Sequence, residues 1–380
     1  MSEQILRSGD GRVSFGELFY DLVFVFAITQ ISHFLLSHFT LTGVLQTGFL
    51  FLAVWWIWIY STWVLNRLNP ESLGVRLLLF AMMIGGLFMS MALPQAFAER
   101  GAVFGIAFAV VQVGRSVFIL VHSGDLPNVQ RTYRRITSWV ALAGVFWVWG
   151  GLADPSDRVL LWGLALGIEL IAPILRYPVP GLGRDTTTDW SINGGHMAER
   201  CGLFVIICLG ETLLVSGATF AGMVWDAPGV AAFGSAVLGA IAMWWVYFHV
   251  GHKRGTHLIE HSANPGALGR LAFTYLHIPI IAGIVLGAVG SELTIAHPMY
   301  PASWGQSLVI VGGTLVFLAG NGLFKRVSAP RFPLSHLVGM ALCLGVFAAT
   351  PWLTLLLLNS VTVIILVVVA VWEDRSLNRT

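Results

Sequence analysis

Apolar segments of about 20 residues recur along the whole chain, separated by short polar loops. A transmembrane helix needs about 20 consecutive apolar residues. Twelve candidate spans are present, at 15–36, 43–65, 75–97, 101–121, 136–153, 158–176, 196–218, 229–251, 268–291, 303–324, 333–350 and 352–372. Only 11% of the residues are charged, which leaves too little polar surface for a soluble globule. The sequence therefore predicts an all-α, polytopic membrane helix bundle.

The positions of the basic residues predict how these spans are oriented. With twelve spans, both termini and the loops that follow even-numbered spans lie on one side of the membrane. Of the 21 Lys and Arg residues, only Arg100 and Arg158 fall on the other side, while Arg115 and Arg200 fall within spans. Basic residues concentrate in cytoplasmic loops, so we expect both termini to be cytoplasmic.

Similar segments recur in the two parts of the chain. Three pairs appear in the same order, namely Gly16–Val25 with Ala198–Ile207, Ala53–Trp58 with Ala242–Tyr247, and Arg76–Leu77 with Arg270–Leu271. The pattern predicts a first six-helix half at 1–176, a cytoplasmic linker at 177–195 and a second six-helix half at 196–380. Several transporters are built from such repeats and bind their substrates between them. The alternative is chance recurrence of Trp pairs and small residues in a Trp-rich membrane protein.

Ionisable residues inside the predicted spans are candidates for a substrate- or ion-binding site. A charged side chain inside a span costs between ~3 and ~17 kcal/mol, so it normally faces the protein interior. The candidates are Glu17, Asp21, Arg115, Glu169, Glu199, Arg200, Glu211 and His277. At a rise of about 1.5 Å per residue, their depths place all except Glu211 near one layer below the cytoplasmic boundary.

This set holds five acids and two fixed bases, Arg115 and Arg200. Either some acids are protonated, or a cation or cationic ligand completes the balance, or water reaches the layer. The first two options indicate a proton- or cation-handling site. In the alternative, the two arginines pair with acids only to hold helices together, while Glu17 and Glu199 reach the membrane interface.

Four of these segments carry a resemblance to a known family. The chain resembles the bacterial low-temperature-requirement A (LtrA) family at Glu17–Val25, Ala198–Phe204, Leu209–Glu211 and Tyr275–Pro279, and the likeness covers nearly the whole chain. Where that family commonly has Phe, this chain has Tyr20, which adds a hydroxyl beside the acids. The resemblance implies a multi-pass bacterial membrane protein linked by name to growth in the cold, and it names no substrate. It supports six of the candidates, Glu17, Asp21, Glu199, Arg200, Glu211 and His277.

These observations favour a proton- or cation-coupled secondary transporter in the bacterial inner (plasma) membrane. The alternative is a non-transporting sensor or structural protein for cold or envelope stress. We expect no enzymatic nucleophile, no cofactor and no nucleic-acid partner, and the oligomeric state stays open. Four histidines near the eighth span lack an acid or thiol that would complete a metal site, so we expect no metal either; they are His249, His252, His257 and His261.

Overall fold

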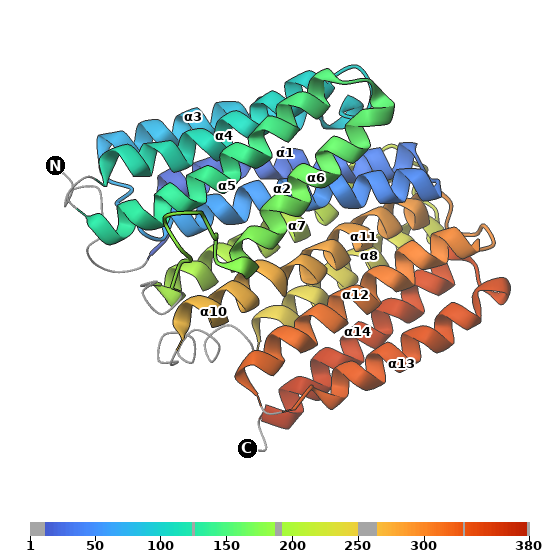
Figure 1. Ribbon diagram of the computed structural model, residues 1–380. Helices are drawn as coiled ribbons and strands as arrows, with labels where there is room; N and C mark the ends of the chain where they lie inside the picture. Colours follow the sequence, from blue (N-terminus) through green and yellow to red (C-terminus); the bar gives the residue numbers. More distant parts are fainter. Residues whose placement is uncertain (1–11, 124–125, 187–191, 250–263, 330, 378–380) are drawn as a thin grey trace. The chain divides into compact units, whose positions relative to one another are not determined.

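The computed structural model describes residues 12–123, 126–186, 192–249, 264–329 and 331–377, and this part of the chain is all-α (Figure 1). The long helices are α1 (Phe15–Ser37), α2 (Leu41–Leu65), α3 (Leu73–Ala92), α4 (Gly101–His122), α5 (Pro127–Leu152), α6 (Pro155–Leu175), α7 (Gly194–Ala221), α8 (Ala227–Phe248), α11 (His277–Ala296), α12 (Trp304–Ser328), α13 (Leu334–Ala348) and α14 (Leu355–Leu377). The short α10 (Pro265–Gly269) and a π-helical turn (Arg270–Tyr275) precede α11. The predicted fold class is confirmed.

Ten helical segments of the described chain are long and apolar enough to cross a membrane. The remaining two predicted spans also form helices, but each lacks one of these properties. α5 carries Arg131, Arg134 and Arg135 near its start, which lowers its hydropathy, and α13 has only 15 residues. The chain is therefore a multi-pass membrane protein, and in its described part a helix forms at each of the twelve predicted spans.

Short polar side chains and backbone geometry set several helix ends. The Thr40 hydroxyl accepts a hydrogen bond from the Gly43 backbone N–H at 3.1 Å and begins α2. Ser303 and Gln306 form a reciprocal capping box that begins α12. α6 ends at Arg176, which adopts the left-handed conformation with φ 62°.

The helices divide into two compact units. Unit 1 takes the described residues within Met1–Phe34, His38–Met197 and Ala263–Ala267, and unit 2 takes those within Leu35–Ser37, Ala198–Ser262 and Leu268–Thr380. The internal repeat and the boundaries at residues 176 and 196 stay predictions.

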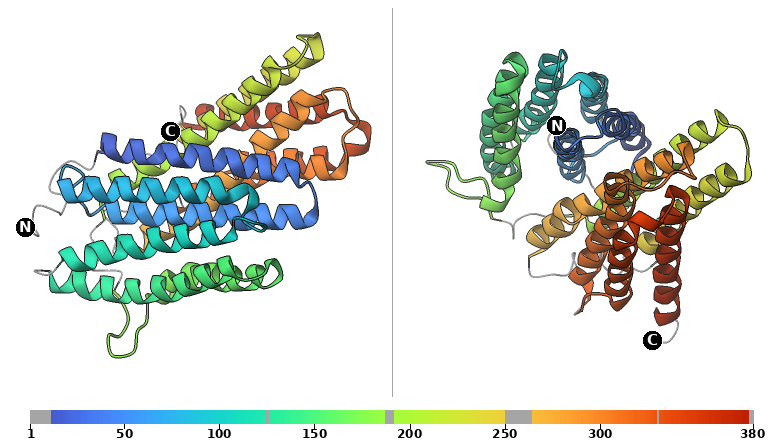
Figure 2. Two further views of the ribbon diagram at one scale, coloured as in Figure 1. Left: turned by 90° about the horizontal axis from the view of Figure 1, so that it is seen from above. Right: turned by 90° about the vertical axis from the view of Figure 1, so that its right-hand side faces the viewer.

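In unit 1, α4 packs between α3 and α5, and α6 lies against α5 (Figures 1 and 2). Gly105 of α4 allows a close approach to α5, because a Cβ there would collide with the carbonyl oxygen of Trp147. The Trp162 indole of α6 donates to the same carbonyl at 3.0 Å. Small residues and buried tryptophans therefore hold α4, α5 and α6 closely together.

In unit 2, α11 packs against α12, α8 packs against α14, and α13 contacts both α12 and α14 (Figure 1). A glycine again brings two helices together, because a Cβ at Gly283 of α11 would lie 2.5 Å from the backbone nitrogen of Phe317 in α12. Between membrane helices such close contact supplies van der Waals attraction where no hydrophobic driving force acts.

Candidate functional site

A chain of buried hydrogen bonds crosses unit 1 and contains Arg115 and Glu169, each 1% exposed. Gln112 lies one turn before Arg115 on α4. Its Nε2 donates to Glu169 Oε2 at 2.6 Å, and its Oε1 accepts from Arg115 Nη2. The Trp147 indole of α5 donates to the other oxygen, Glu169 Oε1, at 3.2 Å. Two neutral donors therefore hold the carboxyl group of α6, and an amide separates it from the guanidinium.

The same series of hydrogen bonds continues from Arg115 to α2 and α1. Arg115 Nη1 donates to Ser61 Oγ at 2.7 Å and to the Ile57 carbonyl oxygen at 3.2 Å. Ser61 uses its own hydrogen on that carbonyl, at 2.8 Å. The Tyr20 hydroxyl, 2.9 Å from Ser61 Oγ, must therefore be the donor in this contact. The Tyr20 hydroxyl, which the sequence places beside the acids, thus donates to Ser61 and links α1 to this series of hydrogen bonds.

Glu17 and Asp21 share one face of α1, and both are buried, at 0% and 1% exposed. The Trp58 indole of α2 donates to Asp21 Oδ1 at 2.9 Å. An apolar span thus buries two carboxyl groups one turn apart.

Glu17 belongs to a second group of hydrogen bonds, which joins α1, α2 and the start of α7 within unit 1. His196 Nε2 lies 2.8 Å from Glu17 Oε2, and His196 Nδ1 lies 3.1 Å from Asn66 Nδ2. The Asn193 backbone fixes the Asn66 amide, since its N–H donates to Oδ1 at 3.1 Å and its carbonyl accepts from Nδ2 at 2.8 Å. Asn66 Nδ2 therefore also donates to His196 Nδ1, and His196 Nε2 carries the proton that faces Glu17.

The other four candidates belong to unit 2. Arg200 and Glu211 of α7 are buried, at 0% and 2% exposed, whereas Glu199 is exposed. Adjacent residues of a helix point about 100° apart, so α7 cannot turn Glu199 and Arg200 to the same side. That the candidates of both units meet in one layer stays a prediction.

His277 is fully buried at the start of α11. Its Nδ1 lies 2.8 Å from the Ala272 carbonyl oxygen, which can only accept, so Nδ1 carries the proton. Its Nε2 then accepts from the Tyr247 hydroxyl of α8, 2.8 Å away. Ala272 lies in the π-helical turn, where backbone hydrogen bonds such as Leu276 N to Leu271 O span five residues. This local geometry gives the imidazole its acceptor.

Unit 2 also contains a buried ion pair outside the candidate set. Lys325 of α12 and Glu373 of α14 are 4% and 6% exposed, and Lys325 Nζ donates to Glu373 Oε2 at 2.6 Å. Lys325 also donates to the Val246 carbonyl oxygen at 2.9 Å, and His336 Nδ1 lies 3.4 Å from Glu373 Oε1. The lysine that the sequence assigns to a cytoplasmic loop therefore joins α8, α12 and α14.

Of the four histidines considered for a metal, only His249 lies in the described part of the chain, with Nε2 3.0 Å from Asp374 Oδ1. His252, His257 and His261 lie outside it.

Sequence reasoning missed the neutral partners of the buried charges. The sequence could have indicated Gln112 as a partner of Arg115, because a polar residue three positions before Arg115 lies on the same face of an apolar helix. It gives no such indication for His196 and Asn66, since both lie at helix ends and meet only through the fold.

Buried polar groups inside apolar helices define a polytopic, all-α membrane protein with a polar interior. A family model described as "Bacterial low temperature requirement A protein (LtrA)" matches residues 12–371. The chain belongs to this family. It is 42% identical over 366 residues to "Uncharacterized protein RA0937" of Rhizobium meliloti (strain 1021), covering 95% of this chain and 89% of that protein. No solved structure matches the chain.

Proposed function

We propose that the protein is a proton- or cation-coupled secondary transporter of the bacterial inner (plasma) membrane, with both termini in the cytoplasm. The observation that carries this proposal is the environment of Glu169. Its carboxyl group is buried, and its hydrogen-bond donors, Gln112 and Trp147, are both neutral. A proton can therefore bind and leave without breaking a direct ion pair, as a coupling group requires.

The hydrogen-bond chain gives such a proton a mechanical consequence. An ionised Glu169 accepts from Gln112, which in turn accepts from Arg115. When Glu169 takes up a proton, the carboxyl group becomes partly a donor and its attraction for the Gln112 amide weakens. Because Arg115 also donates to Ser61, the change reaches α2. Protonation thus acts on the packing of α2, α4 and α6.

The other candidates have roles in the same proposal. Asp21 and Glu17 are further acids that can exchange protons or bind a cation, and Glu211 is a buried candidate acid of unit 2. Arg115 and Arg200 supply counter-charge, and the His277 imidazole is a relay. The substrate in this proposal is a small molecule or an ion.

One observation favours the alternative of a non-transporting membrane sensor or structural protein in cold or envelope stress adaptation. Ser61 Oγ is fully used, as it accepts from Arg115 and Tyr20 and donates to Ile57. Such saturated polar groups also hold helices together without any transport.

The test is flux in proteoliposomes that contain a pH-sensitive dye, with imposed Na⁺, K⁺ or pH gradients and mixtures of amino acids, sugars and organic cations outside. We expect a gradient-dependent pH change in the wild type that Glu169→Gln abolishes while the variant remains folded and monodisperse. Glu71→Gln is the control, because Glu71 is an exposed loop residue paired with Arg76.

Two outcomes contradict the proposal. Flux that persists in Glu169→Gln removes this residue from coupling. A wild type that moves nothing under any gradient, with a lower Tm in the Glu169 variant, supports the sensor or structural alternative instead.

A further inference from the structure

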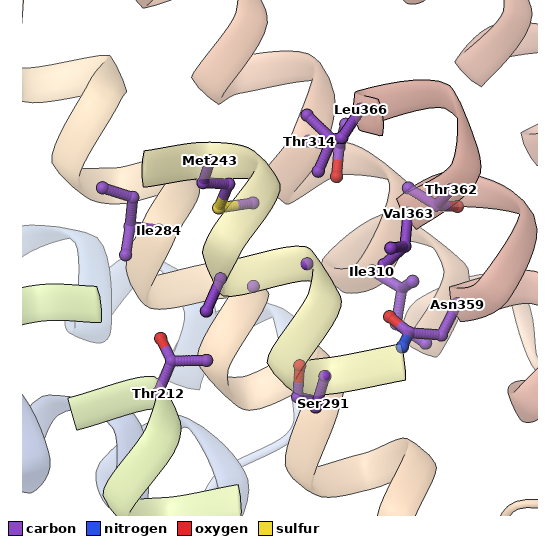
Figure 3. A pocket seen from close by; sticks show the side chains of 14 residues that line it. Thr212, Met243, Ile284, Ser291, Ile310, Thr314, Asn359, Thr362, Val363 and Leu366 are labelled. Atoms are coloured by element: carbon purple, nitrogen blue, oxygen red, sulfur yellow. The ribbon is translucent and has the colours of Figure 1, made fainter. Parts of the chain in front are cut away.

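A small cavity lies inside unit 2, lined by residues of α7, α8, α11, α12 and α14 (Figure 3). It offers about 20 Å³ to the centre of a water-sized sphere. A single water needs roughly 10–15 Å³ on that measure. The cavity therefore suits one water or one bare ion and excludes an organic substrate.

Five oxygen-bearing side chains line this cavity, and four helices contribute them (Figure 3). They are Thr212 of α7, Ser291 of α11, Thr314 of α12, and Asn359 and Thr362 of α14. α8 contributes small residues, including Gly239, which leave the space between these groups. Apolar packing alone does not require five neutral oxygen-bearing side chains around one cavity.

Hydrogen bonds already made use the donors of three of these groups. Thr212 Oγ1 donates to the Cys208 carbonyl at 3.2 Å, and Thr362 Oγ1 donates to the Leu358 carbonyl at 2.7 Å. Asn359 Nδ2 donates to Ser235 Oγ at 3.0 Å. The two threonine hydroxyls can then offer only lone pairs, and Asn359 keeps its Oδ1 and one N–H. The hydroxyls of Ser291 and Thr314 can rotate to offer their lone pairs. Each of the five side chains can therefore present an acceptor oxygen to a cation.

The charges of the lining residues limit which ion the cavity can hold. The described lining residues include no base. They also include no carboxylate, and a divalent ion would need carboxylates as direct ligands. A single positive charge matches this arrangement.

We propose that this cavity binds one dehydrated monovalent cation of about the size of Na⁺, through the oxygens of Thr212, Ser291, Thr314, Asn359 and Thr362. Hard cations take such oxygen ligands, and several neutral oxygens replace the hydration shell of an ion inside a membrane. The inference names a cation for the proposed transporter but does not rest on transport, because binding is measured without flux.

The experiment measures thermal unfolding of the purified full-length protein by tryptophan fluorescence. NaCl replaces choline chloride or KCl at constant ionic strength. A ligand that binds only the folded state raises Tm with its concentration, so we expect a saturable rise with Na⁺ that exceeds the effect of K⁺ and choline.

Three variants locate the binding site. Thr362→Val keeps the shape of the side chain but removes an oxygen, and should weaken the apparent Na⁺ affinity by about tenfold or more. Thr294→Val is the matched control, because Thr294 is buried and donates to the Gly290 carbonyl at 2.8 Å but does not line the cavity. Gly287→Ala fills the cavity instead, since its Cβ would lie 3.2 Å from Met243 Cε.

Gly287→Ala should abolish the rise of Tm with Na⁺. It should not lower Tm in choline, since alanine favours the helix. This variant keeps the test decisive if Thr362→Val fails to fold. The inference is overturned by a wild type whose Tm responds equally to Na⁺, K⁺ and choline, which assigns the cavity to water. It is also overturned if Gly287→Ala and every folded Thr362→Val sample respond like the wild type. A protein that binds Na⁺ and moves no ion keeps this inference and loses the transport proposal.

Discussion

His196 Nε2 lies 2.8 Å from Glu17 Oε2, although 179 residues separate them in the chain. The contact joins the first turn of α7 to the first turn of α1 within unit 1. Asn66 fixes its direction, because the amide donates to His196 Nδ1 and leaves the imidazole proton on Nε2. One acid of the candidate set is thus held by a histidine whose tautomer is set by the backbone of Asn193.

The tautomer of His196 is the first prediction. We expect ¹⁵N chemical shifts of histidine-labelled protein to show His196 as the Nε2–H form, and Asn66→Leu to remove this preference because Nδ1 loses its donor. Losing the buried amide should also cost about 1–3 kcal/mol of folding free energy. The exposed His33 should give the same signal in both proteins. An Nδ1–H signal from His196 in the wild type would contradict the assignment.

Two neutral replacements of Glu169 give a stability prediction that tests its role as a hydrogen-bond acceptor. Glu169→Leu leaves the Gln112 amide and the Trp147 indole without an acceptor, and should destabilise the protein by about 2–5 kcal/mol. Glu169→Gln keeps one acceptor oxygen and leaves only one of the two donors without an acceptor, so it should cost less, about 1–3 kcal/mol. Thermal unfolding followed by tryptophan fluorescence gives the order. The exposed Glu71 serves as the control, since Glu71→Leu should change little. Equal losses for the two Glu169 variants would refute this account of its environment.

The buried pair of Lys325 and Glu373 gives a third prediction. Lys325→Met leaves the Glu373 carboxylate without the lysine in a site that is 6% exposed, and should cost about 3–5 kcal/mol. Combining it with Glu373→Gln should recover a large part of that loss, because no unpaired charge remains. Arg326→Met, at the exposed neighbouring position, should be nearly neutral. The check is a double-mutant cycle on Tm, and strict additivity of the two changes would rule out the coupling.

The sequence predicts the charged members of unit 1 but not what holds them. Arg115 and Glu169 stand out because a charge in an apolar span is costly wherever it points. Neutral polar side chains can face either lipid or the protein interior. The roles of Gln112, Trp147 and Ser61 therefore depend on how each helix is rotated about its axis, which the periodicity of the sequence does not determine. Lys325 shows the opposite failure, since it lies near a span end where basic residues normally reach water. Its burial depends on Glu373, 48 residues away on another helix.

The exposure of Glu199 has a related cause. Depth along α7 places it beside Arg200, but depth does not fix the direction of a side chain, and neighbouring residues diverge by about 100°. Span positions follow from hydropathy alone. For this reason ten predicted spans match helices that are both long enough and apolar enough to cross a membrane. The contents of the site depend on rotations and tilts that only packing decides.

Ser61 provides the last prediction, because it accepts from both Tyr20 and Arg115. Tyr20→Phe removes one neutral donor and leaves Ser61 bonded to Arg115 and Ile57, so it should cost only about 0.5–1.5 kcal/mol. Ser61→Ala removes one acceptor of the buried Arg115 guanidinium, which keeps Ile57 and Gln112, and should cost more, since a hydrogen bond from a charged group contributes more than one from a neutral group. Thermal unfolding of the two single variants and the double variant measures both. The double variant should be no worse than Ser61→Ala, because the Tyr20 hydroxyl has already lost this acceptor. A Tyr20→Phe loss as large as that of Ser61→Ala would show that the hydroxyl of Tyr20, not the guanidinium of Arg115, is the main partner of Ser61.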